Sequence, residues 1–113
     1  MLLARSYHFP KGMFSALAGF CEVGESLSMT LDREIYEEVG IYVDNHTYFS
    51  SQSWPFPHSL MIAFECDYVS GKIKIDKNEI EDAKWFSKNE ISCLLPSKMS
   101  IARRLIDNYL GNI

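Results

Sequence analysis

Several features that define other protein classes are scarce in this chain of 113 residues. No stretch approaches the run of about 18 apolar residues that a membrane-spanning helix needs, and no basic segment followed by an apolar one opens the chain. Lys and Arg number 11 against 15 Asp and Glu, so the net charge is −4. No basic excess favours nonspecific binding to nucleic acid. These absences argue against a membrane protein and predict a soluble, cytoplasmic one.

Cysteine is also too scarce and too scattered to organise the fold. Cys21, Cys66 and Cys93 are odd in number, and no two of them are separated by only two residues. This spacing fits neither a disulfide framework nor a structural zinc site. We therefore expect three reduced cysteines in the core and no structural zinc.

The chain does contain enough apolar material for one core, since 47 % of its residues are hydrophobic and 13 % are aromatic. At this length we expect a single domain, residues 1–113, without repeats or linkers. The patterns predict a class in which strands and helices mix, α/β (α+β), with helices on either side of the strands. Extended segments are expected at residues 1–8, 13–17, 41–51, 59–68, 72–75 and 83–86, and helices at residues 27–39, 89–94 and 101–110.

The most informative segment is residues 19–41, which predicts a helix with two marked ends. Ser26 can cap its beginning, and Gly40 can end it in the left-handed conformation. Apolar residues recur every four positions between these ends and should form one stripe that faces a core. They are Leu27, Leu31, Ile35 and Val39.

Neighbouring faces of the same helix carry a cluster of carboxylates. Glu34 lies three residues before Glu37 and four before Glu38, so the three side chains are close together. Glu38 also follows Leu31 by seven residues, which places it beside the apolar stripe, where its charge is partly desolvated. Mg²⁺ and similar hard cations bind such carboxylates together with substrate phosphate. The alternative is an ordinary acidic helix with a solvated face, in which Arg33 pairs with Glu37.

The fixed positions of this segment resemble the Nudix motif. Glycine, five residues, glutamate, seven residues and then Arg-Glu-aliphatic-x-Glu-Glu-x-Gly-aliphatic are all present between Gly19 and Ile41. Glu25, Arg33 and Gly40 in this register favour the metal site over the solvated helix. The resemblance implies a Nudix-type α/β/α sandwich with a mixed sheet.

A second motif follows at residues 51–59, which read Ser-Gln-Ser-Trp-Pro-Phe-Pro-His-Ser. Proline removes donors from a sheet, so this segment is expected to be a stiff, aromatic, extended loop rather than the interior of a strand. Alone it could be only a packed aromatic corner. After a Nudix motif it resembles the corresponding segment of the NADH diphosphatase family, with Ser53 where that family usually has proline.

The resemblance covers nearly the whole chain, but only the C-terminal catalytic part of that family. Family members carry an N-terminal domain, a four-cysteine zinc module and the first strand or strands of the sheet ahead of this part, so we expect an N-terminally truncated domain. The family also implies a homodimer. The strand at residues 1–8 should then lack a neighbour and lie at or near the dimer contact.

The resemblance also implies roles for individual residues. Glu34, Glu37 and Glu38 would be catalytic and would hold Mg²⁺ or Mn²⁺ together with Glu79 and the backbone carbonyl of Ala18. The substrate would be bound by an aromatic ring that stacks on adenine, by residues that line a dinucleotide pocket and by one residue of a helix. These residues are Phe20, Gln52, Ser53, Trp54, Pro55, Phe56, Pro57, His58, Ser59 and Ala102.

Three assignments stay more open. Glu81 is the alternative to Glu79 as a metal ligand. Both lie in an acidic patch that could simply be solvated. Arg33 is expected to orient a glutamate through a salt bridge rather than to contact substrate. His8, His46 and His58 show no spacing typical of metal ligands, so we assign none of them to a metal site or to catalysis.

The expected reaction is hydrolysis of the diphosphate bond of NADH or NAD⁺ to a nicotinamide mononucleotide and AMP. The 5′ end of NAD-capped RNA is a further candidate substrate, and the order among NADH, NAD⁺, ADP-ribose and capped RNA stays open. One alternative is a housecleaning Nudix hydrolase that acts on other nucleotide derivatives. The other is a catalytically weak binding module.

Overall fold

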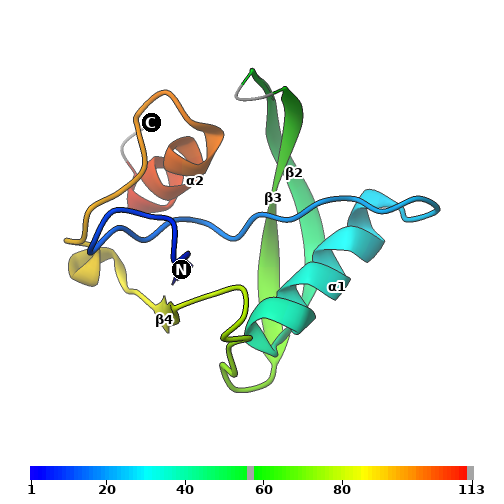
Figure 1. Ribbon diagram of the computed structural model, residues 1–113, viewed down its shortest axis with the longest axis horizontal. Coiled ribbons are helices and arrows are strands. Elements are labelled where there is room, and N and C mark those ends of the chain that lie inside the picture. Colours follow the sequence, from blue (N-terminus) through cyan, green and yellow to red (C-terminus); the bar gives the residue numbers. More distant parts are fainter. Residues whose placement is uncertain (56–57, 112–113) are drawn as a thin grey trace.

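The computed structural model describes residues 1–55 and 58–111, which form two helices, four strands and one short 3₁₀ helix (Figure 1). In chain order the elements are β1 (Leu2–Arg5), α1 (Leu27–Val39), β2 (Tyr42–Trp54), β3 (Ser59–Ser70), β4 (Asp82–Trp85), η1 (Lys88–Glu90) and α2 (Ile101–Leu110).

A long antiparallel hairpin of β2 and β3 is the largest element of the fold. Its ladder runs from the pair Tyr42–Ser70 to the pair Trp54–Ser59, with irregular register around Asn45, whose φ is 53°. Residues 51–54 lie in a strand, and the expectation of a loop from residue 51 is wrong. Pro55 follows the last paired residue, so its missing N–H removes no ladder bond.

The first strand is paired rather than free. β1 pairs antiparallel with β4, from Leu2–Trp85 to Arg5–Asp82, and Ala4 also bridges Ser15. Residues 1–8 were expected to lack a neighbour, and for β1 this is wrong. The reason is that residues 82–85 and residue 15 return to its two sides.

Helix α1 begins and ends at the capping residues that the sequence predicts. The Ser26 hydroxyl accepts a hydrogen bond from the Met29 N–H at 3.2 Å, and Gly40 ends the helix at φ 73°, donating its N–H to the Tyr36 carbonyl. The apolar stripe is buried unevenly. Val39 is fully buried, whereas Leu27 at the other end remains 40 % exposed.

Several shorter expectations need correction. Residues 13–17 make two isolated bridges instead of a strand, residues 72–75 form no strand, and the expected helix at residues 89–94 is reduced to η1. Each lacks a long periodic pattern, so its conformation depends on distant neighbours. Cys21 is exposed rather than in the core, although all three cysteines are free thiols as expected.

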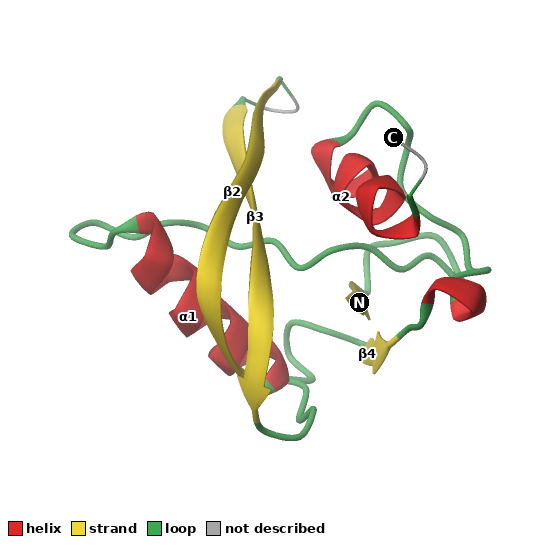
Figure 2. Cartoon of the chain, turned by 180° about the vertical axis from the view of Figure 1, so that it is seen from behind, coloured by secondary structure: helices red, strands yellow, loops and turns green. Residues whose placement is uncertain are grey.

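The helices lie on different parts of the hairpin. α1 crosses one half of it, and α2 lies beside the other half (Figures 1 and 2). One core cluster includes Val39, Ile41 and Ala83, and a second is centred on Leu3 and Ile106. The expected α/β class is confirmed, with both two-stranded sheets antiparallel and one isolated parallel bridge between Met13 and Leu94. No helix in residues 1–55 or 58–111 is long and apolar enough to cross a membrane.

Candidate active site

Arg33 ties the segment that precedes α1 to the helix itself. Its Nε and Nη2 donate to the two carboxylate oxygens of Glu25 at 2.7 and 2.9 Å, and Nη2 also donates to the Phe20 carbonyl at 2.9 Å. The hydrogen bond from Arg33 is the main reason that the pKa of Glu25 falls to about 2. Such a two-pronged pair fixes geometry as well as charge. Glu25 and Arg33 are motif positions that are not expected metal ligands. Their hydrogen bonds hold the loop before α1 against the helix.

The remaining guanidinium nitrogen of Arg33 faces the expected metal ligands. Nη1 lies 2.7 Å from Glu34 Oε1 and 3.3 Å from Glu37 Oε2. This is the orienting role expected for Arg33. The pairing with Glu37 at four residues' spacing is also present, as the solvated-helix alternative requires. The two interpretations are separated by the surroundings of Glu38.

Gly19 has a packing role that its position in the motif does not reveal. The carboxylate of Glu34 lies directly against its backbone, and a Cβ at residue 19 would be 2.5 Å from Glu34 Cδ. A contact this short forces the glutamate to move. The fixed glycine therefore leaves room for the carboxylate.

Glu38 is the strongly perturbed carboxyl group of the site. Burial raises its pKa to about 8, with further contributions from the charge of Glu34, a hydrogen bond with Glu34, and the charges of Glu79 and Glu37. A solvated acidic helix would not desolvate this group. The expected combination of partial burial and like-charge repulsion is present, and a bound cation would relieve both.

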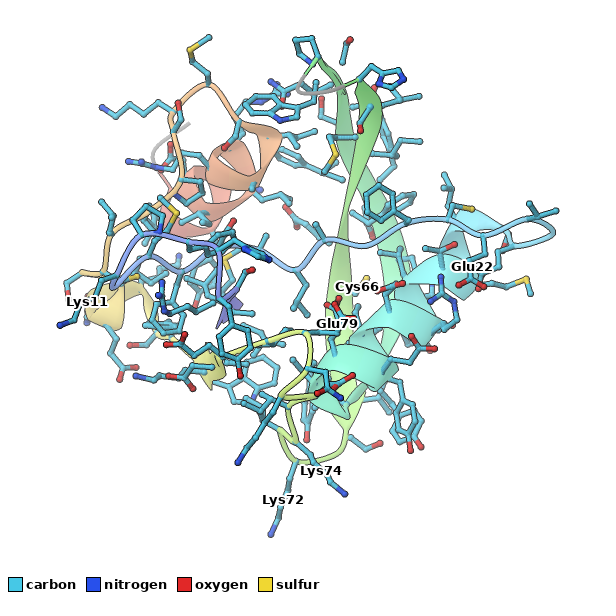
Figure 3. The ribbon with its side chains drawn as sticks, in the orientation of Figure 1. Lys11, Glu22, Cys66, Lys72, Lys74 and Glu79 are labelled. Atoms are coloured by element: carbon cyan, nitrogen blue, oxygen red, sulfur yellow. The ribbon has the colours of Figure 1, made fainter. Side chains whose placement is uncertain are left out.

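These side chains meet in a cavity of about 390 Å³ beside α1. All five expected metal ligands line it, and Figure 3 shows the Glu79 side chain on the side of α1. Glu81 instead pairs with Arg5 at 3.2 Å, which favours Glu79 of the two alternatives. The full lining is Ala18, Gly19, Phe20, Glu22, Arg33, Glu34, Glu37, Glu38, Asp76 and Glu79.

Asp76 was not anticipated from the sequence. It lies in the coil after β3, and its N–H donates to the Glu38 carbonyl at 2.9 Å, which holds it at the end of α1. No residue pattern marks this position. The contact arises because the chain returns to α1 after the hairpin.

The lining fits a hard divalent cation, although the carboxylates are not yet gathered around one point. Within the described residues, no group of three Asp, Glu, His or Cys side chains is arranged to hold a metal ion. Yet the cavity wall carries six carboxylates and one guanidinium, and oxygen-rich sites of this kind suit Mg²⁺ and Mn²⁺. Arg33 holds one oxygen of Glu34 through Nη1 at 2.7 Å, and Glu34 also shares a hydrogen bond with Glu38.

Comparison with known proteins agrees with this geometry, because the Nudix domain family matches residues 1–109. The chain belongs to the Nudix family. A MutT Nudix hydrolase from Burkholderia pseudomallei shares the fold, with a TM-score of 0.70 at 19 % identity over 96 % of this chain and 86 % of that one.

Two curated Nudix relatives carry the same name, NAD-capped RNA hydrolase NudC. The protein from Pseudomonas aeruginosa is 54 % identical over 98 % of this chain and 40 % of its own length. The protein from Chromobacterium violaceum is 56 % identical over 100 % of this chain and 42 % of its own length. The chain therefore spans about two fifths of the length of these relatives.

The substrate-binding residues expected for this Nudix domain are only partly brought together. Phe20 is 81 % exposed and lines the acidic cavity, so its ring is free to stack on a base. The described residues of the hairpin tip do not line that cavity, and Ala102 lines a different one. Phe56 and Pro57 lie outside the described residues. The tip residues that are described are Gln52, Ser53, Trp54, Pro55, His58 and Ser59.

Gln52 has a structural partner that the sequence did not suggest. Its side-chain Nε2 donates to the Met99 carbonyl at 2.7 Å, and its Oε1 accepts from the Ile101 N–H at 2.8 Å. These bonds connect the end of β2 to the start of α2. The adjacent Ala102 is thereby held close to the hairpin tip.

Proposed function

We propose that this Nudix domain hydrolyses the diphosphate bond of NADH or NAD⁺, giving a nicotinamide mononucleotide and AMP, and acts on the 5′ end of NAD-capped RNA. The observation that carries the proposal is the convergence of all five expected metal ligands on one acidic cavity. The names of the two relatives, both NAD-capped RNA hydrolases, support the choice of substrate.

The side chains then have distinct tasks. Glu34, Glu37, Glu38 and Glu79, with the Ala18 carbonyl, would hold Mg²⁺ or Mn²⁺. When bound, such cations neutralise the diphosphate and lower the pKa of a coordinated water. One of the glutamates would take the proton of the attacking water, and Glu37, more than half exposed at its side chain, is our choice for this role.

The surrounding groups hold the substrate and its ligands in place. Arg33 keeps Glu34 and the loop at Phe20 in position through the hydrogen bonds described above. The exposed ring of Phe20 would stack on adenine. Gln52, Ser53, Trp54, Pro55, His58 and Ser59, with Ala102 at the start of α2, would contact the rest of the dinucleotide.

One observation favours a second candidate, a housecleaning hydrolase of other nucleotide derivatives. The described residues of the hairpin tip do not line the acidic cavity, so a smaller diphosphate compound could react there without them. A panel of NADH, NAD⁺, ADP-ribose, NAD-capped RNA and nucleoside triphosphates, assayed with Mn²⁺, tests both candidates. Preference for the NAD-containing compounds supports the first, and preference for triphosphates supports the second.

The Trp54→Ala variant tests the contribution of the hairpin tip. If the tip forms a rigid wall for the dinucleotide, the variant should lose much more activity on NADH than on a small generic diphosphate, because rigid contacts bind at low entropic cost. The ratio of the two kcat/KM values is the measurement. Equal losses on both substrates would make Trp54 a packing residue instead.

The remaining features proposed here concern the whole molecule. We propose that residues 1–113 act as one Nudix domain, that the protein works in the cytoplasm, and that it forms a homodimer. Large exposed apolar side chains, among them Tyr36, Tyr42 and Met99, are compatible with such a contact. Light scattering across a range of dilutions distinguishes a dimer from a monomer.

A further inference from the structure

Basic side chains are unevenly distributed along this acidic chain. Residues 42–71 contain no Lys or Arg, whereas residues 72–77 read Lys-Ile-Lys-Ile-Asp-Lys. All three lysines of this lysine segment, residues 72–77, are exposed. In the part of the chain that the structure describes, Lys84 is the only lysine that forms an ion pair. The ammonium groups of the lysine segment are therefore available to an anionic ligand.

Backbone hydrogen bonds hold the lysine segment along the end of α1. The Lys74 N–H donates to the Val39 carbonyl at 2.9 Å, and the Asp76 N–H donates to the Glu38 carbonyl at 2.9 Å. Asp76 and Glu38 both line the acidic cavity. The lysine segment thus runs over the surface toward the cavity and ends at its wall.

The side chains of the lysine segment alternate between the core and the solvent. Ile73 and Ile75 pack against the core cluster that contains Val39. Because successive side chains of an extended segment point in opposite directions, Lys72 and Lys74 face outward. Figure 3 shows both side chains pointing away from the body of the protein. Two positive charges therefore follow each other on the outer side of the path to the cavity.

Two stacked tyrosines lie where the lysine segment begins. The rings of Tyr36 from α1 and Tyr42 from β2 have centroids 5.1 Å apart and planes 29° apart. They are 51 % and 54 % exposed. Tyr42 pairs with Ser70, which precedes Lys72 by two residues. Exposed aromatic rings next to basic side chains are the two components with which proteins bind nucleotide chains, the rings by stacking on bases and the charges by contacting phosphates.

We propose that the polynucleotide part of an NAD-capped RNA leaves the acidic cavity along the lysine segment. Its phosphates would contact Lys72 and Lys74, and a base would stack on the tyrosine pair. The proposal rests on the function proposed for the acidic cavity, which places the diphosphate of the cap there.

The charges of the cavity itself explain why a separate basic surface is needed. Its wall carries six carboxylates and one guanidinium, that of Arg33. Arg33 is engaged by Glu25 and Glu34 through hydrogen bonds of 2.7 Å each. A polynucleotide carries a negative charge at every phosphate, and its affinity depends chiefly on basic contacts to these phosphates. The lysine segment is the basic surface that adjoins the cavity.

Other roles of these residues predict different behaviour. The lysines could complement the partial negative charge at the C-terminal end of α1, which stabilises a helix without any ligand. They could bind an acidic polypeptide, which needs their charge but no stacking surface. The tyrosine pair could belong to a contact between two copies of the chain. Only RNA binding requires the lysines and the tyrosines together.

The test is binding of a 5′-monophosphorylated RNA of about ten nucleotides to the full chain with Mn²⁺, followed by fluorescence anisotropy. This RNA is the product of cap hydrolysis, so it is not consumed. The double variant Lys72→Gln/Lys74→Gln should bind about tenfold more weakly at about 0.1 M salt, because two phosphate contacts are lost. The slope of log affinity against log salt concentration should become shallower by about 1.4.

Two further variants serve as controls. Lys11→Gln/Lys88→Gln removes the same charge elsewhere, since Lys11 and the short helix η1 that contains Lys88 lie across the molecule from α1 (Figures 1 and 3). It should bind RNA as the unaltered chain does. Tyr36→Ala should weaken RNA binding about fivefold or more, because a stacked base is lost. Met29→Ala, at another exposed position of α1, should change the affinity little.

Turnover separates this proposal from the proposed function. NADH has no polynucleotide, so Lys72→Gln/Lys74→Gln should hydrolyse it with unchanged kcat/KM. For NAD-capped RNA the KM of the same variant should rise about tenfold. If the unaltered chain hydrolyses neither compound, the proposed function is contradicted, and lysine-dependent binding of RNA would still support this surface.

Four results would overturn the proposal. Equal RNA affinities of the two lysine double variants would show that the lysine segment does not contact RNA. Unchanged RNA affinity of Tyr36→Ala would show that charge alone is recognised, as by an acidic polypeptide. Loss of a dimer in Tyr36→Ala, without loss of RNA affinity, would assign the tyrosines to a contact between copies. An equal rise of KM for NADH and for NAD-capped RNA would show that the lysines act on the cavity and not on the polynucleotide.

Discussion

Burial of the Glu38 carboxyl group, together with the charges of its neighbours, links the acidic cavity to the stability of the protein. The pKa of this group is raised from 4.5 to about 8, chiefly by burial. A carboxyl group with a raised pKa destabilises the folded state as pH rises through the interval between its unfolded and folded values. The free energy of unfolding of the metal-free protein should therefore include a contribution that falls between pH 4.5 and about 8 and is constant above. Glu38→Gln should remove this decline.

Urea unfolding in a chelator, at about pH 5 and about pH 9, measures the difference. Glutamine keeps the shape of the neutral carboxyl group, so the variant should be at least as stable as the unaltered chain at the higher pH. The same decline with pH in both proteins would show that Glu38 is not the group responsible.

Gly19 supports a prediction that concerns geometry rather than charge. In Gly19→Ala the new Cβ would meet Glu34 Cδ at 2.5 Å, so the carboxylate has to leave its place in the cavity. We expect affinity for Mn²⁺ to fall about tenfold to a hundredfold, as for changes that misplace a metal ligand. Calorimetric titration with Mn²⁺ measures the affinity, and circular dichroism shows whether the fold survives. Unchanged affinity in the folded variant would contradict the packing role of Gly19.

Among the elements, the connection between β2 and α2 depends on one side chain. Gln52 makes two hydrogen bonds to the backbone around the start of α2. Gln52→Leu keeps much of the volume but leaves both backbone groups unpaired, which should lower the free energy of unfolding by about 1–3 kcal/mol. Ser53→Ala, at the exposed neighbouring position, is the control and should change stability little. Equal urea midpoints for the two variants would contradict the structural role of Gln52.

The elements also show which signals the sequence carries. α1 was predicted with both ends because Ser26, Gly40 and the apolar spacing act within the helix. The carboxylates on its faces followed from the same periodicity. The end of β2 was misjudged because Trp54 is placed by its pair Ser59, across the turn. Asp76 and the bonds of Gln52 depend on chain segments that meet only after folding.

At the scale of the whole molecule, the hairpin and the β1–β4 pair are separate sheets joined by helices and loops. The apolar core is correspondingly divided into two clusters, one around Val39 and one around Leu3. The acidic cavity shares Ala18, Gly19, Glu34 and Glu38 with a larger cavity of about 920 Å³ beside β3. This arrangement was not visible in the sequence, because composition and periodicity do not report how distant segments come together.

The proposed reaction is hydrolysis of a diphosphate bond by a divalent cation that the carboxylates of α1 hold. The decisive measurement is the turnover of NADH with Mn²⁺, compared with excess chelator and with Glu38→Gln. Nicotinamide mononucleotide and AMP are expected as products only when Mn²⁺ is available. Turnover by folded Glu38→Gln is expected to be lower by about a hundredfold or more. Undiminished turnover in excess chelator, or full activity of Glu38→Gln, would contradict this mechanism.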